Sequence, residues 1–292
     1  MKRTLLTALL MLGSLAAADT QPAPATTPQP AQVDVMTMNR DARCGQVLVT
    51  CLIGGKPMRM MLDTGATHTV LHKESAAKVT EGRWLDTSKM NFNGNANQKP
   101  DILISSLVAG PATAPEHAFM VLDLAAVRVS MAEPLDGILG MDVLGSIPFT
   151  FDLRQNEFYW GLPSQGQIAQ LRGVQDPFGR LFIQAKCEGK DLPLLLDTGS
   201  SITRVAPEQW GPGAKGEVTA QVGDVNEAAR VTVQEGKPAD IEVAEGVVLK
   251  QISPIFGDNS APPVLGMDAL KDQVLIHLPT EESPFGVFLM LK

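Results

Sequence analysis

The sequence predicts a mostly β protein made of two homologous lobes, and three observations support this fold class. The 292 residues include 26 Gly and 21 Pro but one Tyr, and the apolar runs are short and rich in Val and Thr, which is typical of short strands joined by turns. A segment recurs at a fixed shift along the chain, and a stretch rich in Pro and Gly separates the two copies. We therefore expect an N-terminal lobe over residues 34–162, a linker over 163–178 and a C-terminal lobe over 179–292.

The first 18 residues have the pattern of a cleavable signal peptide. Lys2 and Arg3 precede an apolar stretch of about eleven residues, which ends in three alanines up to Ala18. A membrane helix needs about twenty apolar residues, so an uncleaved anchor is the less favoured alternative. Cleavage after Ala18 predicts a secreted or periplasmic protein with no membrane span. Residues 19–33, rich in Pro, Ala and Thr, are expected to form a disordered tether.

Net charge and cysteine content exclude some classes of function and leave one question open. The formal net charge is −8, and such a surface repels phosphate, so nucleic acid is not an expected partner. The three cysteines are Cys44, Cys51 and Cys187. A bridge between Cys44 and Cys51 and three free thiols are both open, and the cysteine spacing contains no metal-binding motif.

Each copy of the repeat begins with two predicted strands and a tight turn. Two apolar runs are joined by Gly-Lys, which favours a hairpin. These runs are residues 47–51 and 58–62 in the first copy, and 181–185 and 192–196 in the second.

The second strand of each copy ends in the same three residues. A shift of 134 positions places Asp63-Thr64-Gly65 onto Asp197-Thr198-Gly199, with Ala66 opposite Ser200. A second motif follows at a shift of 126, where residues 138–142 match 264–268. Two motifs repeated in the same order indicate a duplication of one unit.

The repeated aspartates suggest acid–base chemistry. Each Asp stands on a turn at the end of an apolar strand, where a lone carboxylate is costly unless it is hydrogen-bonded or shares a proton. If the two lobes face each other, Asp63 and Asp197 come together and cannot both ionise easily. Such a pair can take a proton from a water molecule while giving one to a substrate carbonyl.

The paired Asp-Thr-Gly segments, each followed downstream by two apolar residues and a Gly, resemble the aspartic proteases. Residues 136–144, together with 149–152, resemble the retropepsin-like branch, which has bacterial members. The resemblance implies a bilobal acid-protease fold, pepsin-like or retropepsin-like, with two β-barrel-like lobes and a short helix in each. It also implies an aspartic endopeptidase that acts as a monomer on an extended polypeptide and needs no cofactor.

The resemblance assigns roles to the residues of the two turns. Asp63 and Asp197 would hold the catalytic water, and Thr64 and Thr198 would brace the turns against each other. Gly65 and Gly199 would let their backbone N–H groups reach the carboxylates, and Ala66 and Ser200 are the remaining supporting residues.

The two lobes differ in one turn residue and share a second motif. The hydroxyl of Ser200 is expected to donate to a carboxylate, which Ala66 cannot do. Gly140 and Gly266 match the family position where a strand passes under the catalytic turn. Residues 142 and 268, both Asp, are expected to cap the short helix that follows.

A flap over the substrate is also implied by the resemblance. The candidate tip in the first lobe is Phe92, Asn93 and Gly94, within a strong turn sequence. Its counterpart in the second lobe is centred on Gly223. The single Tyr lies after the second motif, so it cannot be a flap tyrosine, and one flap or two remain open.

The histidines favour no metal site. His68 and His72 are four residues apart, but they lie in a run that is predicted to be a strand, where this spacing does not form a metal pair. His117 and His277 are expected to be surface residues or satisfied core residues. No metal is therefore expected.

Two alternatives to an active protease remain. A catalytically inactive pseudoprotease of the cell envelope would bind extended peptides without cutting them. A structural β domain would explain export and the tether, but it would not explain the paired turns.

Overall fold

The first lobe is built on an eight-stranded sheet with the order β2-β3-β4-β9-β5-β8-β7-β6. In this computed structural model, the described residues are 34–36, 38–87, 100–176, 180–223, 228–257, 262–280 and 286–291. The strands of the sheet are β2 (Asn39–Arg40), β3 (Val47–Ile53), β4 (Lys56–Leu62), β5 (Val70–His72), β6 (Gly82–Leu85), β7 (Asp101–Ala109), β8 (Ala112–Leu122) and β9 (Gly137–Leu139). The helices of this lobe are α1 (Lys73–Ala76), α2 (Ala125–Ser130) and α3 (Met141–Leu144).

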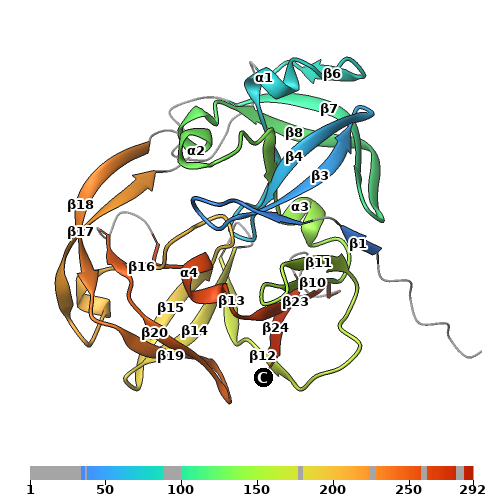
Figure 1. Ribbon diagram of the computed structural model, residues 1–292. Helices are drawn as coiled ribbons and strands as arrows, with labels where there is room; N and C mark the ends of the chain where they lie inside the picture. Colours follow the sequence, from blue (N-terminus) through green and yellow to red (C-terminus); the bar gives the residue numbers. More distant parts are fainter. Residues whose placement is uncertain are drawn as a thin grey trace, which may run out of the picture. The chain divides into compact units, whose positions relative to one another are not determined.

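The second lobe is built on a ten-stranded sheet (Figure 1). Its main path runs β17-β18-β21-β16-β22-β15-β14-β19-β20, and β13 pairs with β14. The strands are β13 (Gly173–Gln175), β14 (Leu181–Cys187), β15 (Lys190–Leu196), β16 (Arg204–Val205), β17 (Ala214–Gly223), β18 (Ala228–Gly236), β19 (Ala239–Ala244), β20 (Val247–Ile252), β21 (Ile255–Phe256) and β22 (Val264–Leu265). A 3₁₀ turn, η1 (Pro207–Gln209), and helix α4 (Met267–Leu270) complete the lobe.

Strands from both lobes join in a third, six-stranded sheet with the order β1-β11-β10-β23-β24-β12. Its members are β1 (Asp34–Met36), β10 (Phe149–Asp152), β11 (Glu157–Trp160), β12 (Ile168–Gln170), β23 (Val274–Leu278) and β24 (Val287–Leu291). At its centre β10 pairs with β23, and Phe149 lies opposite His277 with their rings stacked at 4.8 Å. Residues 33–292 accordingly form one compact unit.

The predicted hairpins at the start of each lobe are present. Strands β3 and β4 are joined through Gly54 and Gly55, whose φ angles are 54° and 71°, and β14 and β15 through Glu188 and Gly189 at 49° and 78°. Successive positive φ angles give the turn whose twist matches a two-residue hairpin. At Gly54 a side chain would also collide with Val79, because an added Cβ would lie 2.7 Å from its Cγ1.

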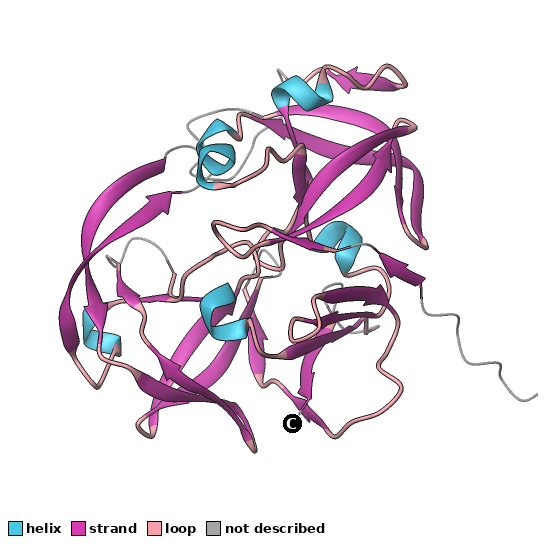
Figure 2. Ribbon diagram, viewed as in Figure 1, coloured by secondary structure: helices cyan, strands magenta, loops and turns pink. Residues whose placement is uncertain are grey.

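The second motif of each lobe passes between the two strands that flank the Asp-Thr-Gly turn. Strand β9 runs parallel to β4 and antiparallel to β5, and β22 has the same relation to β15 and β16. Two related, mostly β lobes are therefore present, as the sequence predicted (Figure 2). The predicted linker region also contains two short strands, β12 and β13.

The three cysteines form no disulfide among the described residues. Cys44, Cys51 and Cys187 are all free thiols, so the bridge between Cys44 and Cys51 is not formed. Cys51 and Cys187 lie in the hydrophobic core that extends through both lobes. No helix in the described part of the chain has the length and apolar character to cross a membrane.

Candidate active site

The Asp63 carboxylate is held by the turn that follows strand β4. Its backbone N–H donates to the carbonyl of Leu139 on β9 at 3.1 Å. Its Oδ1 accepts the N–H groups of Gly65 and Ala66 at 2.8 and 3.0 Å. The adjacent second-motif strand therefore fixes the backbone of Asp63, and the turn itself fixes the side chain.

Asp197 has the same arrangement at the end of β15. Its N–H donates to the carbonyl of Leu265 at 3.2 Å, and its Oδ1 accepts the N–H groups of Gly199 and Ser200 at 2.9 and 3.0 Å. The hydroxyl of Ser200, however, donates to the carbonyl of Ile202 at 2.9 Å. The expectation that this hydroxyl donates to a carboxylate is therefore wrong, because the backbone N–H of Ser200 fills that role.

The two turns lie against each other, so the structure brings both aspartates together. A Cβ added to Gly65 would lie 2.6 Å from Cγ of Asp197, and one added to Gly199 would lie 2.3 Å from Oδ2 of Asp63. Glycine is therefore required at both positions because each turn packs onto the opposite carboxyl group. Both aspartates are only half-buried, so solvent can reach them.

The pair is electrostatically unequal. Burial and the neighbouring charge of Asp197 raise the pKa of Asp63 well above its usual value. Burial also raises the pKa of Asp197, but the hydrogen bond from Asp63, two backbone N–H groups and the charge of Arg204 oppose that rise. When the two carboxyl groups carry one proton, that proton therefore belongs to the pair as a whole.

Thr64 and Thr198 join the two turns through reciprocal hydrogen bonds. Each backbone N–H donates to the hydroxyl of the other residue, at 3.1 and 3.2 Å. Each hydroxyl donates at 2.9 Å to the carbonyl of the residue before the opposite Asp, Leu196 or Leu62. Both threonines are buried, so the separation of the two carboxyl groups is set by this contact.

The expectation that Asp142 and Asp268 cap helices α3 and α4 is wrong. The residues at the N-caps are Gly140 and Gly266, and neither helix has a side-chain cap. Each carboxylate binds the threonine just before the strand that follows the catalytic turn, and Oδ1 of Asp268 also accepts the N–H of Ala269 in α4 at 2.8 Å. The contacts run from Thr69 N–H and Oγ1 to Asp142 at 2.9 and 2.7 Å, and from Thr203 N–H and Oγ1 to Asp268 at 2.8 and 2.7 Å.

These two aspartates secure the catalytic turns to the second motifs. The hydroxyls of Thr69 and Thr203 accept the N–H groups of Gly140 and Gly266, each at 3.2 Å. Both glycines are also tightly packed: a Cβ at Gly140 would lie 2.6 Å from the carbonyl carbon of His68. Thr69 and Thr203 match each other at the shift of 134, but this match gave no indication of what the two threonines bind.

In the first lobe, Asp142 has a further partner. Nε2 of His117 lies 3.3 Å from Oδ2 of Asp142. Burial acts to raise the pKa of Asp142, but the adjacent His117 ring and the hydrogen bonds from Thr69 outweigh it, and the pKa is lowered. For Asp268 burial prevails and the pKa is raised. His117 is therefore a partner within this network rather than a surface residue.

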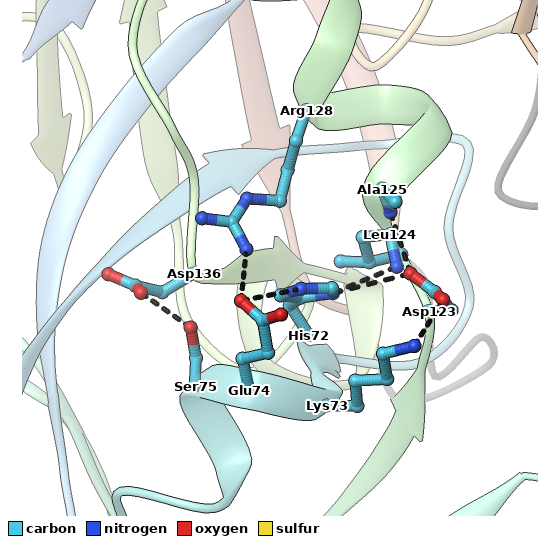
Figure 3. Close-up of polar contacts among 9 residues, drawn as sticks. All are labelled: His72, Lys73, Glu74, Ser75, Asp123, Leu124, Ala125, Arg128 and Asp136. Carbon is cyan, nitrogen blue, oxygen red and sulfur yellow. Dashed lines mark hydrogen bonds and ion pairs between the residues drawn. The ribbon is translucent and has the colours of Figure 1, made fainter.

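His72 and His68 have separate surroundings. His72 is buried, and its Nδ1 accepts the N–H of Leu124 at 3.0 Å, beside Glu74 and Asp123 (Figure 3). Burial, followed by the nearby charge of Arg128, lowers its pKa. His68 is exposed and contacts the hydroxyl of Thr67. Within the described ranges, no three His, Cys, Asp or Glu side chains are grouped to hold a metal ion.

Sequence reasoning missed Gln46. This buried residue of the first lobe donates from Nε2 to the carbonyl of Gly199 in the second lobe, and its Oε1 is buried with no hydrogen-bond partner in the described part of the chain. Its counterpart at the shift of 134 is Arg180. Because the two copies of the repeat differ here, the repeat gave no sign that Gln46 belongs to the site.

Only one of the two flap candidates lies within the described residues. Phe92, Asn93 and Gly94 lie outside the described residues, between the paired strands β6 and β7. Gly223 ends β17 and pairs with Ala228 at the start of β18. This long hairpin reaches the first lobe, where both strands contact helix α2 (Figure 1).

Comparison with known proteins gives one match that bears on this site. Residues 49–143 match the family model described as aspartyl protease. The matched segment contains the first Asp-Thr-Gly turn and the second motif up to Asp142. A search of curated proteins found no match.

Proposed function

We propose that this chain, whose residues 49–143 match the aspartyl protease family model, is an endopeptidase that cuts extended polypeptides with a water molecule activated by Asp63 and Asp197. The family match supports protease activity. The observation that supports the dyad is the contact of the two turns, in which each glycine packs on the opposite carboxyl group. The duplicated half outside the matched segment would supply the second acid.

The proposed mechanism follows from the single proton that Asp63 and Asp197 share. The ionised carboxylate of the pair takes a proton from the bound water as the water oxygen attacks the carbonyl carbon of the scissile peptide. The protonated carboxyl group donates its proton to the carbonyl oxygen, which gives a tetrahedral diol. A proton then passes to the peptide nitrogen, the C–N bond breaks, and the pair is left with one proton again. The backbone N–H groups of the turns hold both carboxylates in place throughout.

Substrate and location are part of the same proposal. The family resemblance favours a polypeptide with apolar side chains on both sides of the scissile bond. Because one chain supplies both acids, a monomer would suffice. Residues 1–18 would direct export to the periplasm or the medium and would be removed after Ala18.

The proposal is tested by digesting a mixed peptide library with wild type and Asp63→Asn from about pH 3 to about pH 8. We expect cleavage by wild type with a bell-shaped pH profile and none by Asp63→Asn or Asp197→Asn. Asp191→Asn is the matched control, because the Asp191 side chain is 89% exposed on β15. Cleavage that persists in Asp63→Asn would refute the dyad. Tight peptide binding without cleavage at any pH would favour the inactive pseudoprotease.

A further inference from the structure

The two lobes present matching rows of side chains beside their catalytic turns. Residues that pair directly across neighbouring strands point to the same face of a sheet. Following the strand pairs outward from the hairpin gives one row of four residues in each lobe. The rows are Leu48, Met61, Ile138 and Val70 in the first lobe, and Phe182, Leu195, Val264 and Arg204 in the second.

The row of the first lobe is apolar, and other side chains cover it. Its four members cluster with Ala66 of the catalytic turn. Buried residues that follow helix α2, including Met131 and Leu135, cover them. Val70, at the end of the row, is only 7% exposed. Among the described residues, this row of the first lobe therefore contains no charged side chain.

The row of the second lobe ends in a cation instead. Arg204 is half-buried, and its aliphatic part lies over Gly257, where an added Cβ would be 2.6 Å from Cδ. Its Nη2 donates to the carbonyl of Pro262 at 3.2 Å. In the part of the chain that is described, no Asp or Glu forms an ion pair with it.

Two further observations place the guanidinium of Arg204 near the catalytic turn of the second lobe. Arg204 follows Thr203, which is bound to Asp268, so the strand that carries it is fixed to the second motif. Its charge also acts on Asp197, where it opposes the rise of the pKa that burial causes. A guanidinium has five N–H donors, and most of those of Arg204 remain for another acceptor.

We propose that Arg204 is a specificity-determining residue, which binds the carboxylate of an acidic substrate side chain near the scissile bond. This inference rests on the proposed protease function. A planar guanidinium binds a carboxylate through two parallel hydrogen bonds, which no neutral side chain can match. Because the first lobe has the buried Val70 at the equivalent position, the acidic preference applies to one side of the scissile bond only.

The test compares peptides that differ only by Glu or Gln at one position, placed in turn at each position within about three residues of the scissile bond. We expect wild type to favour Glu over Gln by about tenfold in kcat/KM at one position. Arg204→Val, which installs the residue of the first lobe, and Arg204→Gln should both lose the preference. Arg204→Glu should favour Lys there. Arg172→Val is the matched control, because Arg172 is exposed in the segment between the lobes.

The experiment also separates selection from an indirect effect on the dyad. If Arg204 acted only through Asp197, its replacement would shift the pH profile for the Glu and Gln peptides equally and leave their ratio unchanged. That result would overturn the proposal. So would a wild-type enzyme with the same rate for both peptides at every position.

A binding measurement keeps the inference independent of cleavage. Fluorescence anisotropy of the same labelled peptides with Asp63→Asn should show about tenfold tighter binding of the Glu peptide. The difference should vanish in the double variant with Arg204→Gln. Discrimination in binding without cleavage by wild type would refute the proposed activity and uphold the role of Arg204. Equal binding of Glu and Gln peptides would refute that role, whether or not the chain cuts peptides.

Discussion

Thr64 and Thr198 donate their backbone N–H groups to each other's hydroxyl oxygens, at 3.1 and 3.2 Å. Each hydroxyl thus accepts one hydrogen bond and donates another to the opposite chain segment. Only a side chain with a hydroxyl group on Cβ can do both in this space. The contact between the lobes at the site is therefore specified by two residues, each next to an aspartate in sequence.

We expect Thr198→Val to lower the free energy of unfolding by about 2–4 kcal/mol, because the buried N–H of Thr64 and carbonyl of Leu62 lose their partner. Thr198→Ser should retain most of the stability. Urea denaturation measures both, and Thr50→Val, at an exposed position of β3, is the control. An unchanged midpoint for Thr198→Val would show that the contact between the threonines contributes nothing to stability.

Asp63→Asn should abolish turnover and yet stabilise the protein at neutral pH by ~0.5–2 kcal/mol. The pKa of Asp63 is raised in the folded state. Its contribution to stability is therefore fully present below the pKa of the unfolded chain and is lost as the pH rises through the folded pKa. The gain from Asn should accordingly be larger at pH 7 than near pH 4. Chemical denaturation at both pH values tests this, and a variant less stable than wild type at pH 7 would contradict it.

Asp142→Asn and Asp268→Asn should behave differently, although the residues are equivalent in the repeat. The lowered pKa of Asp142 means that its charge stabilises the fold above the unfolded pKa, and this contribution is lost as the pH falls through the folded pKa. We expect a loss of about 1–3 kcal/mol at pH 7 that shrinks below about pH 4. Asp268, with a raised pKa, should show a smaller loss at pH 7. Equal losses at every pH would show that His117 gives no advantage to its lobe.

Gln46→Leu should move the acid limb of the pH–rate profile to higher pH. The carbonyl that Gln46 binds belongs to the same peptide plane as the Ser200 N–H that donates to Asp197. Without the amide, this plane is less fixed and the hydrogen bond that lowers the pKa of Asp197 is weaker. The profile of Gln170→Leu, exposed on β12, should match wild type. A fall in rate with an unmoved acid limb would assign Gln46 to general packing.

The sequence indicated the parts of the molecule that the duplication repeats. Both Asp-Thr-Gly turns, the hairpins before them and the passage of β9 and β22 beside them follow from residues that recur at two shifts. Such features are visible because each copy confirms the other. The pairing of Asp142 with Thr69, 73 positions away, was not visible, since an Asp in the first turn of a helix also fits a capping pattern.

Differences between the copies were harder to interpret than similarities. Arg204 stands where the first lobe has Val70, and Arg180 where it has Gln46. A substitution between copies signals that the lobes have diverged, but not what the new side chain contacts. The sequence did not predict the six-stranded sheet either. Residues 149–152 and 274–278 pair in it, but an apolar run does not indicate which strand it pairs with when more than a hundred residues separate the two.

The six-stranded sheet has a consequence for the order of events during synthesis. Its central strands come from both lobes, and β24 is one of its members, so it can be completed only after β23 and β24 have left the ribosome. The first lobe is made early, but its strands β10 and β11 must wait for β23 and β24 to cover them. A chain whose synthesis has not yet reached β23 would therefore carry Asp63 and Asp197 without the completed six-stranded sheet. On this view, the proposed proteolytic activity begins only after β24 has been made.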